Sequence, residues 1–202
     1  NTADYDAGGI YNYDGVLTLT NCTVTRNTVE YFSGWGVCND GTLTLTNCTV
    51  SGNTAEYGSG GGICSYGTCT LNNSIVALNS AGDEGADLRG VVDATASLIG
   101  LDPGFVDAAG GDYRLSPTSI AINAGDNALL PADAHDLDGD GDAGEALPVD
   151  LDGNARVADG TVDLGAYEYQ GPPDPAREAA TSMVTTLADV ARQARRIAEY
   201  LP

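Results

Sequence analysis

The chain contains no lysine: its 8 basic residues are all arginine, and they face 29 acidic residues, giving a net charge of −21. A nucleic-acid surface needs a basic stripe that replaces counterions, so this composition excludes DNA and RNA as partners. Cations are the small partners that such a charge attracts. The sequence also has no run of about 18 apolar residues, so we expect no membrane insertion.

Residue types that serve catalysis or zinc binding are equally scarce. The single histidine, His135, has no nucleophile signature near it. The 5 cysteines do not show the Cys/His spacing of a zinc site. Cys22 aligns with Cys48, and Cys38 with Cys64, in the repeat described next. We interpret them as small inward residues in preference to disulfides between neighbouring coils.

An internal repeat organises the first half of the chain. It contains the related strings VLTLTNCTVTRN, TLTLTNCTVSGN and TCTLNNSIVALN, whose Thr-Leu alternation is typical of a β-strand. One unit, with two or three short strands, cannot bury its apolar face alone, whereas stacked copies pair in parallel and share a core. Two columns of asparagine recur every 26 residues: Asn1, Asn27, Asn53 and Asn79, and Asn21, Asn47 and Asn73.

The repeat predicts an all-β fold, a parallel β-helix or solenoid with about 26 residues per coil. Right-handed winding follows from the crossover preference of parallel strands. We expect the coils to occupy residues 1–125 and to lack an N-terminal part, because Asn1 falls inside the repeat pattern. Asparagine tolerates the backbone angles of bends and its amide can bond the next asparagine in a stack, so we place both columns at bends.

Three strings carry a resemblance to a known family: GGIYN followed by LTLTN, then DPGFVDAAGGDYRLSPTSIAINAGD, then DLDGNARVADGTVDLGAYEYQ. They resemble bacterial right-handed parallel β-helix surface proteins with polymorphic outer-membrane-protein-like GGI(Y)N repeats and a "choice-of-anchor" type C-terminal region. The resemblance covers residues 1 to about 171. It implies a large secreted or cell-surface protein. It also implies a following anchor signal, but neither an LPXTG-like nor an apolar anchor follows Gln170.

Carboxylates crowd residues 126–171, which we interpret as a loop-rich capping segment. In the string DLDGDGD they stand at every second position, and glycine permits the tight loop in which Ca²⁺ takes oxygen ligands. An EF-hand would need a bidentate glutamate at the twelfth position, where Leu147 stands; Glu145 is at the tenth. Two interpretations of this string remain: a calcium-binding loop of looser geometry, and an acidic loop that is only solvated. The candidate ligands are Asp136, Asp138, Asp140, Asp142, Asp150 and Asp152.

The end of the chain changes character. Residues 162–169 are expected to form a closing strand whose tyrosines cover the end of the stack, and residues 172–175, PPDP, a stiff linker. Residues 176–202 are predicted to form one amphipathic α-helix, which either folds back on its own coils or docks on a partner. Its apolar seam has heptad spacing: Met183, Leu187, Val190, Ala194, Ile197 and Leu201.

Three functions fit these features. The first, which we expect, is a non-enzymatic structural or adhesive module, secreted or on the cell surface, with calcium as a candidate cofactor. It would form homo-oligomers, or bind another surface protein, through its open first coil and its C-terminal helix. The second is glycan binding through Tyr31, Trp35 and Tyr57, although loop aromatics also shield core edges. The third is a polysaccharide lyase or hydrolase, for which the body offers few basic residues.

Overall fold

The computed structural model describes residues 1–4, 8–30 and 35–171. Asn1–Gln170 forms one compact unit of the chain. The predicted linker and amphipathic helix fall in the second unit, Gly171–Pro202, and residues 172–202 lie outside the described residues. The helix and its apolar seam therefore stay predictions. In the described part, no helix has the length and apolar character needed to cross a bilayer.

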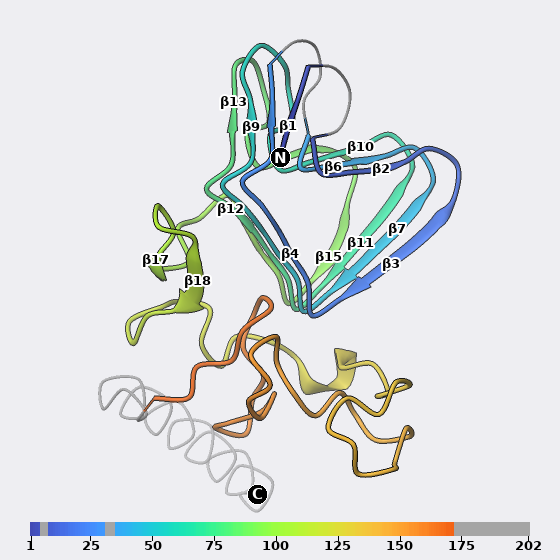
Figure 1. Cartoon of the computed structure of the whole chain (residues 1–202), viewed down its shortest axis with the longest axis vertical. Helices are drawn as coiled ribbons and strands as arrows, with labels where there is room; N and C mark the ends of the chain where they lie inside the picture. The colour runs from blue at the N-terminus through green and yellow to red at the C-terminus, as the bar shows by residue number, and fades with distance from the viewer. Residues whose placement is uncertain (5–7, 31–34, 172–202) are drawn as a thin grey trace, which may run out of the picture. The chain divides into compact units, whose positions relative to one another are not determined.

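Parallel strands stack in coils, so the predicted parallel β-solenoid is confirmed (Figure 1). Each of four sheets has four strands, one from each coil. The first sheet contains β1 (Thr2–Ala3), β5 (Thr28–Val29), β9 (Thr54–Ala55) and β13 (Ser80–Ala81). The second contains β2 (Ile10–Asn12), β6 (Val37–Asn39), β10 (Ile63–Ser65) and β14 (Leu88–Gly90).

The third sheet holds the longest strands of the repeat. The third contains β3 (Val16–Thr20), β7 (Thr42–Thr46), β11 (Thr68–Asn72) and β15 (Asp93–Thr95). The fourth contains β4 (Thr23–Thr25), β8 (Thr49–Ser51), β12 (Ile75–Ala77) and β16 (Leu98–Ile99). Every pairing in the four sheets is parallel. In the third and fourth sheets the register of the first three coils places residues 26 apart in the chain side by side, as in Leu19, Leu45 and Leu71.

Each coil thus has four strands, where the sequence predicted two or three. The reason lies in the asparagine of the string TLTLTNCTVS. Asn21, Asn47 and Asn73 adopt left-handed backbone angles, with φ of 51°, 51° and 47°. A residue in that conformation ends a strand, so one predicted strand becomes two strands that meet at a corner. The placement of this column at a bend is confirmed.

The core is a set of apolar columns, one residue per coil. Leu43, Leu45 and Leu71 are completely buried, and Cys48 and Cys69 pack with them. Cys64 packs with Trp35 and Cys38 in a separate buried cluster. Cys48, Cys64 and Cys69 are buried thiols, and Cys22 is a half-buried one. Their interpretation as inward-facing residues of the repeat is therefore confirmed for these positions.

The other asparagine column forms a hydrogen-bonded ladder through the stack. The side-chain amide of Asn1 donates to Asn27, that of Asn27 to Asn53, and that of Asn53 to Asn79, each at 2.9 Å. Asp87 ends the ladder by accepting from Asn79 at 2.9 Å. The prediction that these amides bond one another along the stack is confirmed. The ladder satisfies buried amides that would otherwise cost folding free energy.

The coil strands end at Ile99, earlier than the predicted limit of residue 125. An antiparallel hairpin, β17 (Phe105–Asp107) and β18 (Asp112–Leu115), follows instead of a further coil. Pro103 lacks the N–H that a parallel ladder would need at that point. Leu115 of the hairpin packs against Ile75 and Ala77 of β12, so the hairpin lies on the side of the stack.

Residues 116–171, here called the acidic segment, contain little regular structure. A 3-10 helix, η1 (Asn127–Leu129), and two isolated antiparallel bridges are present. The prediction of a closing strand at residues 162–169 is wrong, because no strand forms there. The segment also lies against the corner of the coils, not over their end: the amides of Asn21 and Asn73 donate to Val149 O at 2.6 Å and Asp126 O at 2.9 Å.

Buried carboxylates replace strand pairing in the acidic segment. Asp150 accepts from the backbone N–H groups of three residues, Asp163 from two and Glu168 from two. Arg156 is fully buried beside them and donates to the carbonyls of Asp163 and Gly165, each at 2.9 Å. Its guanidinium lies 3.7 Å from Glu168. The N–H groups of Asp163, Glu168 and Tyr169 are thereby used, which a closing strand would have offered to a neighbour.

Candidate functional site

The loop of residues 133–145 is closed at its base. Ala132 and Ala146 form an antiparallel bridge, and the N–H of Asp133 donates to the carbonyl of Glu145 at 2.8 Å. These contacts hold the two ends of the loop together. Between them the backbone of Asp136 is left-handed, with φ of 51°, which turns the chain back on itself.

The closed loop brings carboxylates together in two groups that share Asp138. The first group is Asp133, Asp136 and Asp138, and the second is Asp138, Asp140 and Glu145. Within each group one oxygen of every carboxylate lies within 4.8 Å of the others. Ca²⁺ binds oxygens at about 2.3–2.6 Å, so two of its ligands can lie up to roughly 5 Å apart. In each group, the three carboxylates are therefore close enough to bind the same cation.

Two carboxylate oxygens in these groups are buried without a partner. Asp133 is 1% exposed; its Oδ2 accepts from Leu137 N at 2.6 Å, but its Oδ1 has no hydrogen bond. Oε1 of Glu145 is also buried without one. An ionised oxygen that loses water and gains no partner is costly, and a bound cation would remove that cost. This distinguishes the loop from an ordinary solvated acidic turn.

The local field is strongly negative. Burial raises the pKa of Glu145, and the charges of Asp140, Asp138, Asp142 and Asp133 raise it further. The remaining loop carboxylates shape the backbone: Asp136 accepts from Gly141 N at 3.1 Å, Asp138 from Asp140 N and Asp140 from Asp142 N. Each such bond uses one oxygen, which leaves the other for a cation. The donor set, all oxygen, suits Ca²⁺.

The structure brings together three of the six predicted ligands: Asp136, Asp138 and Asp140. Asp142 belongs to neither group, and its Oδ1 accepts from Gly144 N at 2.9 Å. The other two predicted ligands also lie outside both groups. Asp150 is 4% exposed and binds backbone N–H groups, among them that of Asp152, which is itself exposed.

Sequence reasoning missed Asp133 and Glu145 as ligands. Asp133 stands outside the every-second-residue alternation, and Glu145 is displaced from the EF-hand position. Both enter the site because the loop closes at its base, which a spacing rule does not show. No sequence signal marks them as ligands, because the burial of Asp133 and the contact between the loop ends arise only in the fold.

The three aromatic residues predicted to contact glycans differ in their exposure and surroundings. Tyr31 lies outside the described residues. Trp35 is 9% exposed, donates its indole N–H to Ser59 O at 2.8 Å and meets Tyr66 edge to face. Its ring therefore belongs to the interior of the coils in this arrangement. Tyr57 is 68% exposed.

Comparison with known proteins found no matching family model, no similar curated protein and no similar solved structure. The resemblance of the GGI(Y)N repeats to bacterial surface proteins therefore stays a prediction.

Proposed function

We propose that the chain is a non-enzymatic structural or adhesive β-helix module of a secreted or cell-surface bacterial protein, and that its acidic loop binds calcium. The coils wind right-handed, as parallel crossovers prefer. The observation that carries the calcium assignment is the buried, unpartnered Oδ1 of Asp133 inside a carboxylate group. Calcium sites of extracellular modules bind with dissociation constants of about 0.1–1 mM, which fits a loop of this irregular kind in a secreted protein.

Assembly through the first coil is the second part of this proposal. Among the described residues, strands β1, β2 and β3 are the outermost strands of their sheets, and such strands offer N–H and C=O groups to another strand. A further coil, from a second copy or from another surface protein, would continue the asparagine ladder at Asn1. The predicted helix of residues 176–202 supplies a second contact in this proposal.

Calcium titration by calorimetry, with the variants Asp133→Asn and Asp142→Asn, tests the metal site. We expect the intact chain to bind Ca²⁺, and Asp133→Asn to weaken binding by about tenfold or more because it removes a charged ligand. Asp142→Asn is the matched control; it lowers the loop charge equally but should change the affinity by less than about threefold. No Ca²⁺ binding at millimolar concentration, or equal losses in both variants, would contradict the site.

Sedimentation and electron microscopy, in calcium and after chelation, test assembly. Oligomers or filaments that dissolve on chelation support a calcium-dependent assembly module. A monomer that ignores both calcium and chelator would overturn the proposal.

Glycan binding is a second candidate, favoured by exposed rings on the loops and edges of the coils. Tyr13, Tyr57 and Tyr66 are 73%, 68% and 62% exposed. Exposed rings stack on sugar faces, and a glycan array with Tyr57→Ala compares this candidate with the first.

A further inference from the structure

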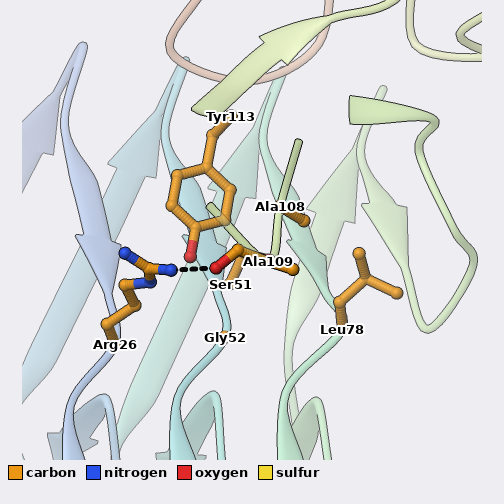
Figure 2. A pocket seen from close by; sticks show the side chains of 7 residues that line it. All are labelled: Arg26, Ser51, Gly52, Leu78, Ala108, Ala109 and Tyr113. Atoms are coloured by element: carbon orange, nitrogen blue, oxygen red, sulfur yellow. Dashed lines mark hydrogen bonds between the residues drawn. The ribbon is translucent and has the colours of Figure 1, made fainter. Parts of the chain in front are cut away.

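A hollow of about 300 Å³ opens between the coils and the loop of the β17–β18 hairpin (Figure 2). Its polar wall consists of Arg26, Ser51 and Tyr113, and its apolar wall includes Ala108 and Leu78. The volume is at the lower end of the range for small-ligand pockets and roughly ten times the share of one water molecule. The hollow therefore has room for a ligand the size of a monosaccharide.

The repeat explains how this space arises. Arg26, Gly52 and Leu78 occupy equivalent positions at one bend of successive coils, all left-handed, with φ of 56°, 67° and 60°. The middle position has no side chain, and a Cβ there would lie 2.8 Å from the hydroxyl oxygen of Tyr113. Glycine at this coil thus makes room for the tyrosine. Phe105 holds the ring of Tyr113 edge to face, with centroids 5.4 Å apart.

Two buried hydroxyls in the wall lack partners. Tyr113 is 4% exposed and Ser51 is fully buried, and the hydroxyl of each is buried without a hydrogen bond. In Figure 2 the hydroxyl of Tyr113 points toward Arg26 and the carbonyl of Ala109. A hydroxyl can donate and accept, and leaving one dry and unpaired destabilises the fold. A polar ligand in the hollow would satisfy both groups.

Arg26 brings a positive charge that no carboxylate of the described residues pairs. Its guanidinium donates to the carbonyls of Ala109 and Gly110, which leaves further N–H groups for another acceptor. By contrast, Arg114 pairs with Asp112 at 2.6 Å, and Arg156 lies 3.7 Å from Glu168. In a chain with a net charge of −21, an unpaired guanidinium beside two unpaired hydroxyls is a site for an anion.

We propose that this pocket binds a small hydroxylated carboxylate, the chemistry of a sugar acid. The carboxylate lies against Arg26, and ligand hydroxyls bond Tyr113 and Ser51. A guanidinium recognises a carboxylate through charge-assisted hydrogen bonds, whereas a neutral sugar gains only the weaker hydroxyl contacts. The pocket shares no residue with the acidic loop, so this proposal does not depend on calcium binding.

Titration with sodium D-glucuronate, followed by NMR or calorimetry, tests the pocket. D-glucose is the neutral matched ligand, and we expect it to bind about tenfold more weakly or worse. Arg26→Gln should lower glucuronate affinity by about tenfold or more, while Arg89→Gln, which removes an arginine bonded to Tyr66 outside the pocket, should leave it unchanged. Equal binding of glucose and glucuronate, no glucuronate binding, or equal effects of the two arginine variants would overturn the proposal.

Tyr113→Phe separates ligand binding from a structural role. It removes only the unpaired hydroxyl, so the Tm should hold or rise, because a buried orphan group is lost. Glucuronate affinity should nevertheless fall by about threefold to tenfold. A fall in Tm with unchanged affinity would assign the hydroxyl to the fold and overturn its part in binding.

Discussion

The coils and the acidic segment are built on opposite principles. In the coils one contact is copied: Leu45 lies between Leu19 and Leu71, and Asn53 between Asn27 and Asn79. These side chains are neutral. The acidic segment has contacts without copies, between buried carboxylates, one buried arginine and backbone N–H groups. The stability of the coils therefore rests on apolar packing and on hydrogen bonds between amides. The stability of the acidic segment depends on contacts of charged side chains.

The largest effect is expected at the centre of the asparagine ladder. Asn53 is fully buried, donates to Val24 O and Asn79, and accepts from the backbone and side chain of Asn27. Asn53→Ala leaves these buried groups unpaired, which should cost about 3–5 kcal/mol of unfolding free energy. Denaturant unfolding measures this loss.

The control for that variant lies at the end of the same ladder. Asn1→Ala removes the exposed first amide, which makes one partly buried bond to Asn27. It should change the unfolding free energy by less than about 0.5 kcal/mol. Equal losses in the two variants would show that burial of the ladder does not govern its contribution.

A smaller loss is expected at the charged centre of the acidic segment. Arg156→Met fills a similar volume but leaves two carbonyls without their donor and Glu168 without its neighbouring charge. Nε and Nη1 of Arg156 have no hydrogen bonds, so their removal offsets part of this loss. The net cost should be about 2–3 kcal/mol, measured by unfolding. Arg114→Met, on an exposed pair, should have little effect, and a comparable loss there would refute the distinction.

The last prediction is a pH dependence of stability that comes from Glu168 in the acidic segment. Burial, with the charge of Asp163 adding to it, raises the pKa of Glu168 from 4.5 to about 8. The folded state holds this proton more tightly than the unfolded state, so the contribution is complete below pH 4.5 and is lost as pH rises toward 8. The Tm should fall over this interval. Glu168→Gln should flatten that fall; an unchanged slope would locate the titrating group elsewhere.

The coils were predictable because the residues that make each contact recur at equivalent positions in three or four coils. Aligning the three repeat strings places Leu17 with Leu43 and Cys69, and the strands pair in this register. The number of strands per coil was not predictable from alternation, because an asparagine within the TLTLTNCTVS string adopts a left-handed angle and splits the strand. Only the backbone conformation of that residue decides between one strand and two.

The acidic segment resisted prediction for a different reason. Its sequence shows carboxylates but not which of them become buried: Asp133 and Asp150 are nearly inaccessible, whereas Asp138 and Asp140 are exposed. Alternation selected exposed and buried carboxylates alike and missed Asp133. The strand expected at residues 162–169 failed because its N–H groups bond to unrelated acceptors in place of one neighbouring strand: those of Leu164 and Gly165 donate to the carbonyls of Ala121 and Asn73, and that of Glu168 to Asp150. Single-sequence patterns carry no information on those contacts.

The attachment of the acidic segment along the side of the stack has a mechanical consequence. It bonds three successive coils from outside, through Asn21 to Val149, Thr49 to Ala166 and Asn73 to Asp126. A pulling force that separates neighbouring coils must also stretch this external strap. The force is then carried both by the hydrogen bonds of the sheets and by those of the acidic segment. A fibre built from such modules would resist shear at the coils that carry the strap and would yield first at the coils that lack it.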